Sequence, residues 1–163
     1  MPLVRSSLPL ACLGAALAAL LLSACGAGSE PTTPPACFEG AAAYAKALSA
    51  APAEVRVNGE TLISECFAER QASGDLEAVG EALVTTATRL NGEARAEPGG
   101  QANLELGYLL GAASAGSEAT QGIHANLLRR LEVAARYAPG GQPLSPRFLA
   151  AYREGFDAGE EQG

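Results

Sequence analysis

The sequence predicts an all-α fold, a small bundle of five to six helices over residues 37–158. Apolar side chains recur three and four positions apart in most segments, as they do on one face of a helix. No segment keeps the apolar–polar alternation of a half-buried strand, and Gly- and Pro-rich stretches separate the segments. Hydrophobic residues make up 48% of the chain and charged residues 18%, which excludes wholesale disorder.

Residues 1–24 are predicted to be a removable export signal. Arg5 precedes an apolar run over residues 10–22. The run is shorter than the about 20 residues that a membrane-spanning helix needs, and it suits the apolar stretch of a secretory signal. It ends in Leu22-Ser23-Ala24-Cys25, a tetrapeptide that resembles the lipobox of bacterial lipoprotein precursors.

This resemblance covers residues 1–25 and implies a lipid anchor. In that class of protein the cysteine that matches Cys25 receives a diacylglyceryl group, the signal is cut before it, and the new amino group is open to acylation, for example by palmitate. The chain is then held at the cell membrane on its extracytoplasmic side. Gly26 leaves open whether this is an inner or an outer membrane. The alternatives are an ordinary secretory signal with an incidental Cys25, and a retained signal anchor.

Residues 25–36 are predicted to be the lipidated cysteine and a spacer. The segment is rich in Gly, Ser, Thr and Pro and has no core-forming side chain before Ala36, so we expect a flexible and partly extended chain. The alternative is an ordered arm that packs on the domain.

Of the four cysteines, Cys12 lies in the predicted signal and Cys25 carries the predicted lipid, which leaves Cys37 and Cys66 as the two remaining thiols. In an exported protein such a pair is expected to form a disulfide. The alternatives are two buried free thiols, or a metal site, for which two thiols and one distant His124 are too few ligands for closed zinc.

The first helices are predicted from apolar spacing and from breaks. A helix over residues 36–50 ends before Pro52, and residues 54–59 are a short extended stretch with a turn at Asn58-Gly59. A second helix is expected over residues 60–71, with Cys66 on its buried face. The clearest helix runs over residues 75–90, with Asp75 as its N-cap and a stop at Asn91-Gly92. Its apolar stripe comprises Leu76, Val79, Gly80, Leu83, Val84, Ala87 and Leu90.

The later helices are also predicted from apolar spacing and from the residues that begin or end a helix. Residues 101–115 are apolar nearly all round, which predicts the central helix of the bundle. Gly107 and Gly111 on one face of that helix predict close helix packing, with a cavity for a lipid-like ligand as the alternative. A helix over 118–137 is expected to bury Ile123 among its apolar residues. Ser145-Pro146 begins the last helix, whose apolar face is formed by Phe148, Leu149, Tyr152 and Phe156. The acidic tail over residues 159–163 is expected to fray.

Candidate chemistry is sparse. His124 is the only histidine and lacks a metal-type partner such as a His four residues away, so we expect a surface or half-buried residue, with a general base as the alternative. The carboxylate pairs Glu65/Glu69 and Glu77/Glu81 are expected to lie on solvated helix faces. The cluster Arg129, Arg130 and Arg136 is expected on an exposed face, with an anionic partner as the alternative.

Charge and the lack of known catalytic motifs exclude several classes of function. A net charge of −7 and the lack of a basic run argue against a nucleic-acid partner. No nucleophile elbow, phosphate loop or paired zinc-ligand spacing occurs, so the sequence predicts no cofactor, no metal site and no catalytic centre. We expect a lipid-anchored envelope protein that acts by binding or scaffolding. The alternatives are a carrier of a small apolar ligand inside the bundle, and an enzyme that uses His124. The sequence leaves the envelope or cell-wall partner open.

Overall fold

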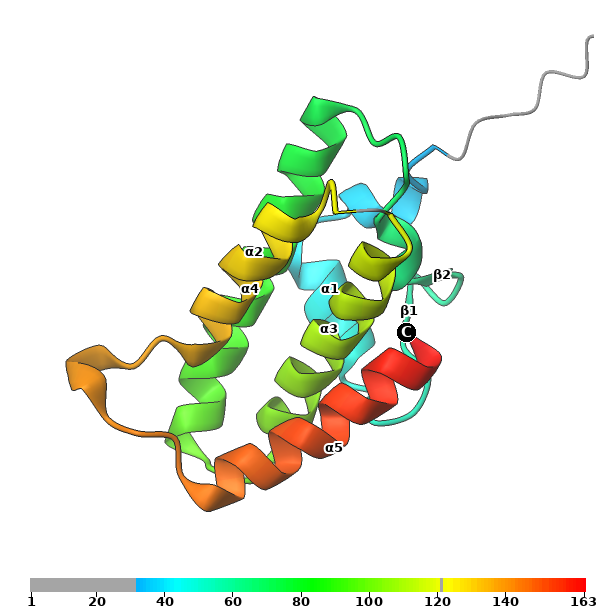
Figure 1. The fold of residues 1–163 in the computed structure, drawn as a ribbon. Helices are drawn as coiled ribbons and strands as arrows, with labels where there is room; N and C mark the ends of the chain where they lie inside the picture. Colours follow the sequence, from blue (N-terminus) through cyan, green and yellow to red (C-terminus); the bar gives the residue numbers. More distant parts are fainter. Residues whose placement is uncertain (1–31, 121) are drawn as a thin grey trace, which may run out of the picture.

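A computed structural model describes residues 32–120 and 122–163 (Figure 1). The predicted signal over residues 1–24, the lipid attachment site Cys25 and residues 26–31 of the predicted spacer lie outside the described residues. In the part that is described, no helix is both long enough and apolar enough to cross a membrane.

The predicted all-α bundle is confirmed. The central helix is α3, against which α1, α2, α4, α5 and η2 all pack. The only sheet in the described ranges is a two-stranded antiparallel hairpin, in which Arg56 pairs with Leu62 and Val57 with Thr61. The α-helices of the described chain are α1 (Ala41–Leu48), α2 (Ser73–Ala96), α3 (Gln101–Glu118), α4 (Ala125–Arg136) and α5 (Pro146–Gln162), and the shorter elements are η1 (Pro35–Phe38), β1 (Arg56–Val57), β2 (Thr61–Leu62), η2 (Ser64–Cys66) and η3 (Pro139–Gly141).

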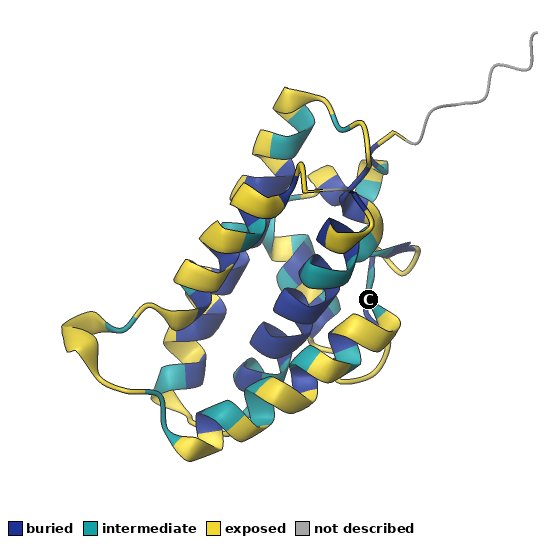
Figure 2. Cartoon of the chain, viewed as in Figure 1, coloured by how far each residue is buried: buried dark blue, intermediate teal, exposed yellow. Residues whose placement is uncertain are grey.

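The helix α3 is buried on most of its circumference, as its lack of a polar stripe predicts (Figure 2). Every residue from Glu105 to Ala113 is buried. The one hydroxyl among these residues has a partner, since the main-chain N–H of Val55 donates to the Tyr108 hydroxyl oxygen at 3.0 Å. The central helix therefore carries the core of the bundle.

Glycines bring α3 and α5 into backbone contact. A Cβ atom on Gly107 or Gly111 of α3 would lie within 3.0 Å of main-chain atoms of α5, and one on Gly155 or Gly159 of α5 would lie as close to main-chain atoms of α3. Gly155 faces Leu104 and Gly159 faces Tyr108, so the two helices run parallel, and α4 returns between them in sequence (Figure 1). The space beside the α3 glycines is thus filled by a neighbouring backbone, as expected from tight packing.

The apolar stripe of α2 is confirmed, although the ends of the helix differ from the prediction. Leu83 and Leu90 are fully buried. The helix begins at Ser73, so Asp75 lies in its first turn, where a carboxylate favours the positive end of the helix dipole. It continues past Asn91 to Ala96 because Asn91 is itself part of the packing, its side-chain N–H donating to the main-chain oxygen of Tyr137 at 2.7 Å.

The predicted helix over residues 60–71 is wrong. Asn58 and Gly59 adopt positive φ angles of 53° and 77°, so the chain folds back and residues 61–62 pair with residues 56–57. The Glu65 carboxylate then accepts a hydrogen bond from the Leu62 main-chain N–H at 2.8 Å, which favours the short helix η2. The apolar residues Ile63, Cys66 and Phe67 are buried because the segment packs against α3, and not because they form one face of a helix.

Two predictions for the C-terminal half of the chain, the start of a helix and the order of the tail, are also corrected. The helix predicted over 118–137 begins only at Ala125, and Ile123 is 47% exposed, because Gly122 has a φ of 87° and turns the chain between α3 and α4. The tail predicted to fray is helical to Gln162. Gly159 packs on α3, and the Ser64 hydroxyl donates to the main-chain oxygen of Gly163 at 2.6 Å.

Candidate functional site

The predicted disulfide between Cys37 and Cys66 is present. The two Cα atoms lie 5.6 Å apart, and both residues are fully buried. The Tyr44 hydroxyl donates to the main-chain oxygen of Cys37 at 3.0 Å, and burial raises the pKa of Tyr44 far above its ordinary value. The bond therefore joins η1 to η2 inside the core.

The chain that enters the disulfide is ordered. Thr33 is buried, and the Gln71 side-chain amide donates to its hydroxyl at 2.9 Å and to the Cys66 main-chain oxygen at 3.0 Å. The Cys37 main-chain N–H donates to Pro34 at 3.0 Å. Residues 33–36, predicted as the end of a flexible spacer, thus belong to the folded domain.

His124 is fully buried, which the sequence did not predict. Its Nε2 lies 2.8 Å from Gln71 Oε1, and its Nδ1 lies 2.7 Å from the Thr120 hydroxyl. Because the Gln71 amide nitrogen already faces Thr33 and Cys66, the Gln71 oxygen must accept, and His124 Nε2 must carry a hydrogen. In the neutral ring, Nδ1 then accepts from Thr120.

The network around His124 also accepts a second proton. The Thr120 hydroxyl lies 2.9 Å from the Ser117 main-chain oxygen, so it can turn toward that oxygen while its own oxygen accepts from a protonated Nδ1. Burial nevertheless lowers the pKa of His124 below its ordinary value of 6.5. The contacts are those of a structural histidine that ties the end of α3 to the start of the domain.

We expect acid to destabilise the fold through His124. Since its pKa is lower in the folded than in the unfolded chain, the unfolded state binds more protons below pH of about 6.5. The free energy of unfolding should therefore fall as the pH drops below about 6.5, and this loss should stop below the folded pKa. Urea unfolding between pH 5 and 8 measures the slope.

The variant His124→Gln is the control for this slope. It keeps a side chain with a donor and an acceptor but has no group that titrates in this range, and His124 is the only histidine of the chain. The difference in unfolding free energy between the two proteins should depend on pH only near and below about 6.5. A difference that is constant with pH would contradict the assignment.

The predicted carboxylate pairs lie on the surface. Glu77 and Glu81 are exposed on α2, as expected. Glu65 and Glu69 are exposed as well, but they do not share a helix face, because Glu65 belongs to η2 and Glu69 to the loop that follows. Within residues 32–120 and 122–163, no group of three or more His, Cys, Asp and Glu side chains is placed to hold a metal ion.

The arginines of α4 are exposed but divide between two sides of the helix. Arg129 and Arg130 line a hollow of about 400 Å³ between α2 and α4, together with the exposed Val133 and Tyr137. Arg136 faces the other side of α4 and lines a hollow that borders α5. The predicted cluster of three arginines is therefore not one patch.

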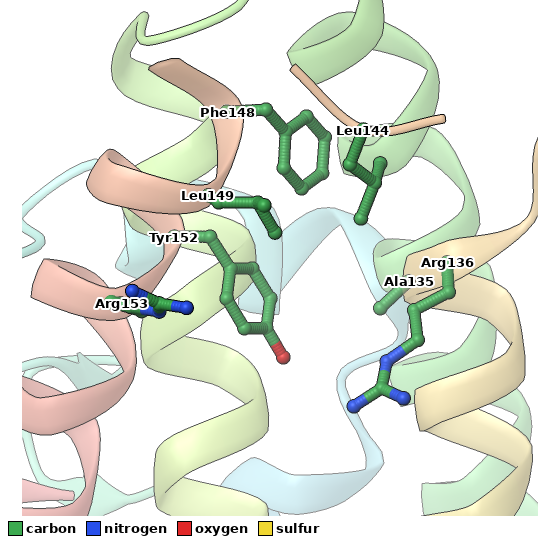
Figure 3. A pocket seen from close by; sticks show the side chains of 7 residues that line it. All are labelled: Ala135, Arg136, Leu144, Phe148, Leu149, Tyr152 and Arg153. Carbon is green, nitrogen blue, oxygen red and sulfur yellow. The ribbon is translucent and has the colours of Figure 1, made fainter. Parts of the chain in front are cut away.

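An apolar hollow with an arginine on each side lies between α4 and α5 (Figure 3). Its volume is about 360 Å³, within the range of small-molecule sites. Figure 3 shows α5 side chains reaching toward Ala135 and Arg136 of α4, with Leu144 closing one end. Its lining residues are Ala135, Arg136, Leu144, Phe148, Leu149, Tyr152 and Arg153.

The α5 side of this groove is built from stacked rings. The ring centroids of Phe148 and Tyr152, and of Tyr152 and Phe156, are each 6.2 Å apart with interplanar angles of 18° and 27°. Burial raises the pKa of Tyr152 to about 12, against a smaller lowering by Arg136, so its hydroxyl stays protonated at neutral pH. The Arg95 guanidinium lies over the Phe148 ring, 5.9 Å from its centroid, within the distance at which a cation and an aromatic ring attract each other.

Sequence reasoning found the aromatic face of α5 but not the groove. Phe148, Leu149, Tyr152 and Phe156 were expected to face the core, yet only Phe148 is buried. The sequence feature that explains the lower burial is a second stripe on the same helix, Gly155 and Gly159. These glycines pack on α3, so the aromatic stripe lies at the edge of that contact and lines the groove. Comparisons with protein-family profiles, with curated proteins and with solved structures found no match to this chain.

Proposed function

We propose that the chain is a lipoprotein, anchored through lipid on Cys25 to the extracytoplasmic side of the cell membrane, whose helical domain acts by binding and not by catalysis. The observation that carries this proposal is the tetrapeptide Leu22-Ser23-Ala24-Cys25 directly after a signal-length apolar run. The buried disulfide supports it, since such bonds persist outside the cytoplasm.

The distance between anchor and domain supports a role close to the lipid. Thr33 is buried in the domain, so at most residues 26–32 separate the domain from Cys25. A fully extended chain from Cys25 to Thr33 spans at most about 30 Å. A domain on so short a tether can meet lipids or envelope proteins near the membrane surface.

The candidate chemistry supports binding over catalysis. The ring of His124 is buried, and both its nitrogens are engaged within the protein. The carboxylate pairs of the sequence face solvent. The hollows beside α4 combine apolar walls with arginine side chains, which suits recognition of a ligand or partner.

The variant Cys25→Ser tests the anchor. We expect wild-type protein to have the intact mass of a chain that starts at Cys25 plus lipid, and to incorporate labelled palmitate. Cys25→Ser should lose both, because its hydroxyl is a far weaker nucleophile than the thiol for lipid attachment.

Cys12→Ser is the matched control for this experiment. It removes the other cysteine of the first 25 residues, and it should keep lipid labelling at the wild-type level. A wild-type chain that starts at another residue and carries no lipid would falsify the anchor. Lipid labelling that survives in Cys25→Ser would also contradict it.

A further inference from the structure

The groove between α4 and α5 has one feature that its packing does not explain: two arginines at an apolar site. Arg136 extends from α4 and Arg153 from α5, and both line the groove. Neither guanidinium has an ion-pair partner among the described residues. In a chain of net charge −7, two such cations beside an apolar floor favour an anionic ligand.

A second hollow extends the same groove. It has a volume of about 230 Å³ and shares Arg136, Tyr152 and Arg153 with the first. Its floor includes Leu110 and Ser114 of α3, and its α4 side carries Glu132. The two arginines therefore lie where the hollows meet, while the larger hollow toward Leu144 and Phe148 contains no acidic residue.

This arrangement separates a charged region from an apolar one. The protonated Tyr152 hydroxyl can donate a hydrogen bond at the junction, beside Arg136 and Arg153. Phe148, Leu149 and Leu144 surround the space beyond it (Figure 3). A ligand that fits must carry an anion at one end and a narrow apolar chain at the other.

We propose that this groove binds a long-chain fatty-acid anion, with its carboxylate at Arg136 and Arg153 and its alkyl chain along Phe148 and Leu149. The inference rests on the proposed binding role of the domain and names its ligand class. Arginine pairs with carboxylates through charge-assisted hydrogen bonds. Glu132, one helical turn from Arg136 on α4, lines the smaller hollow and disfavours a ligand with a second anionic group there.

The test uses the processed full chain in phosphatidylcholine vesicles, with a hexadecanoate that carries a photoreactive diazirine on its alkyl chain. After irradiation, we expect labelled peptides from α4 and α5, and we expect unlabelled hexadecanoate to compete. Hexadecyltrimethylammonium, which has the same chain length and the opposite charge, should not compete. Equal competition by the anion and the cation would overturn the proposal.

Two double variants, one in the groove and one in the hollow between α2 and α4, give a matched comparison. Arg136→Gln/Arg153→Gln should lower labelling by about tenfold, since both arginines are exposed and each exposed ion pair with the carboxylate contributes only a few-fold in affinity. Arg129→Gln/Arg130→Gln removes the same charge beside the α2–α4 hollow, and labelling should stay within about twofold of the wild type. Equal losses in the two double variants would contradict a specific site.

Other occupants give distinct outcomes. Labelling confined to α2 and the Arg129 side of α4 would overturn the proposal in favour of that hollow. Competition by an acidic amphipathic helical peptide, but not by hexadecanoate, would overturn it in favour of a protein partner. The labelling pattern does not depend on acylation of Cys25, which intact mass measures separately, so the ligand and the anchor can fail independently.

Discussion

Gly107→Leu is expected to lower the free energy of unfolding by more than about 4 kcal/mol, the range reached only by severe core defects. A Cβ atom at this position already meets the Tyr152 carbonyl and the Phe156 main-chain nitrogen of α5. Backbone cannot rotate away as a side chain can, so α5 must move off α3. Urea unfolding followed by circular dichroism measures the loss.

Gly107→Ala separates the contribution of the first carbon. Because its Cβ alone meets the backbone of α5, overpacking should cost about 3 kcal/mol or more, and the better helix propensity of Ala offsets only about 1 kcal/mol of this. Its effect should therefore be smaller than that of Gly107→Leu but of the same sign.

Gly92 provides the matched control for both variants. It lies in the interior of α2, and a Cβ atom at this position would have no neighbouring group within 4 Å. Gly92→Ala and Gly92→Leu should each stabilise the helix by about 0.5–1 kcal/mol, because glycine is the poorer helix former. Substitutions that destabilise at Gly92 as strongly as at Gly107 would show that the α3–α5 contact is not responsible.

Removing the disulfide is expected to lower the free energy of unfolding by about 3.5 kcal/mol. The two cysteines are 29 residues apart in sequence, and the chain-entropy model assigns this value to a loop of that length. The double variant Cys37→Ser/Cys66→Ser avoids a leftover thiol, and urea unfolding without reductant compares it with the wild type.

Reduced wild-type protein is the control for the serine variant. It lacks the cross-link but keeps both sulfur atoms, so a similar loss in both proteins assigns the effect to the bond itself. A loss of unfolding free energy below about 1 kcal/mol in the double variant would contradict a structural disulfide. Free thiols at Cys37 and Cys66 in protein from cells lysed with a thiol-blocking reagent would contradict it as well.

The sequence predicted best the helix whose apolar residues form an uninterrupted stripe along one face. Leu83 and Leu90 of α2 lie on a periodic face, and that face is buried because period 3.6 places its members together in space. The hairpin at residues 56–62 was missed as a sheet because two-residue strands are too short to show alternation. Its Asn58-Gly59 turn was readable, since these residues tolerate positive φ.

The groove and the buried His124 were beyond prediction for a different reason. Both depend on residues far apart in the chain. One partner of His124 is Gln71, 53 positions away, and the groove forms only where α4 and α5 lie beside each other on α3. Backbone contact at Gly155 and Gly159 holds α5 against α3, and these two glycines, four residues apart on the last helix, were present in the sequence.

The position of the disulfide also decides how the domain carries mechanical load. If the chain is anchored as proposed, tension from Cys25 enters the domain no later than the buried Thr33 and reaches Cys37 within four further residues. From there the covalent bond transmits it directly to Cys66 and on toward α2. The hairpin and α1 lie within the closed loop of residues 38–65, so a pull between membrane and bound ligand bypasses them while the bond is intact. Reduction would place that whole segment in series with the force.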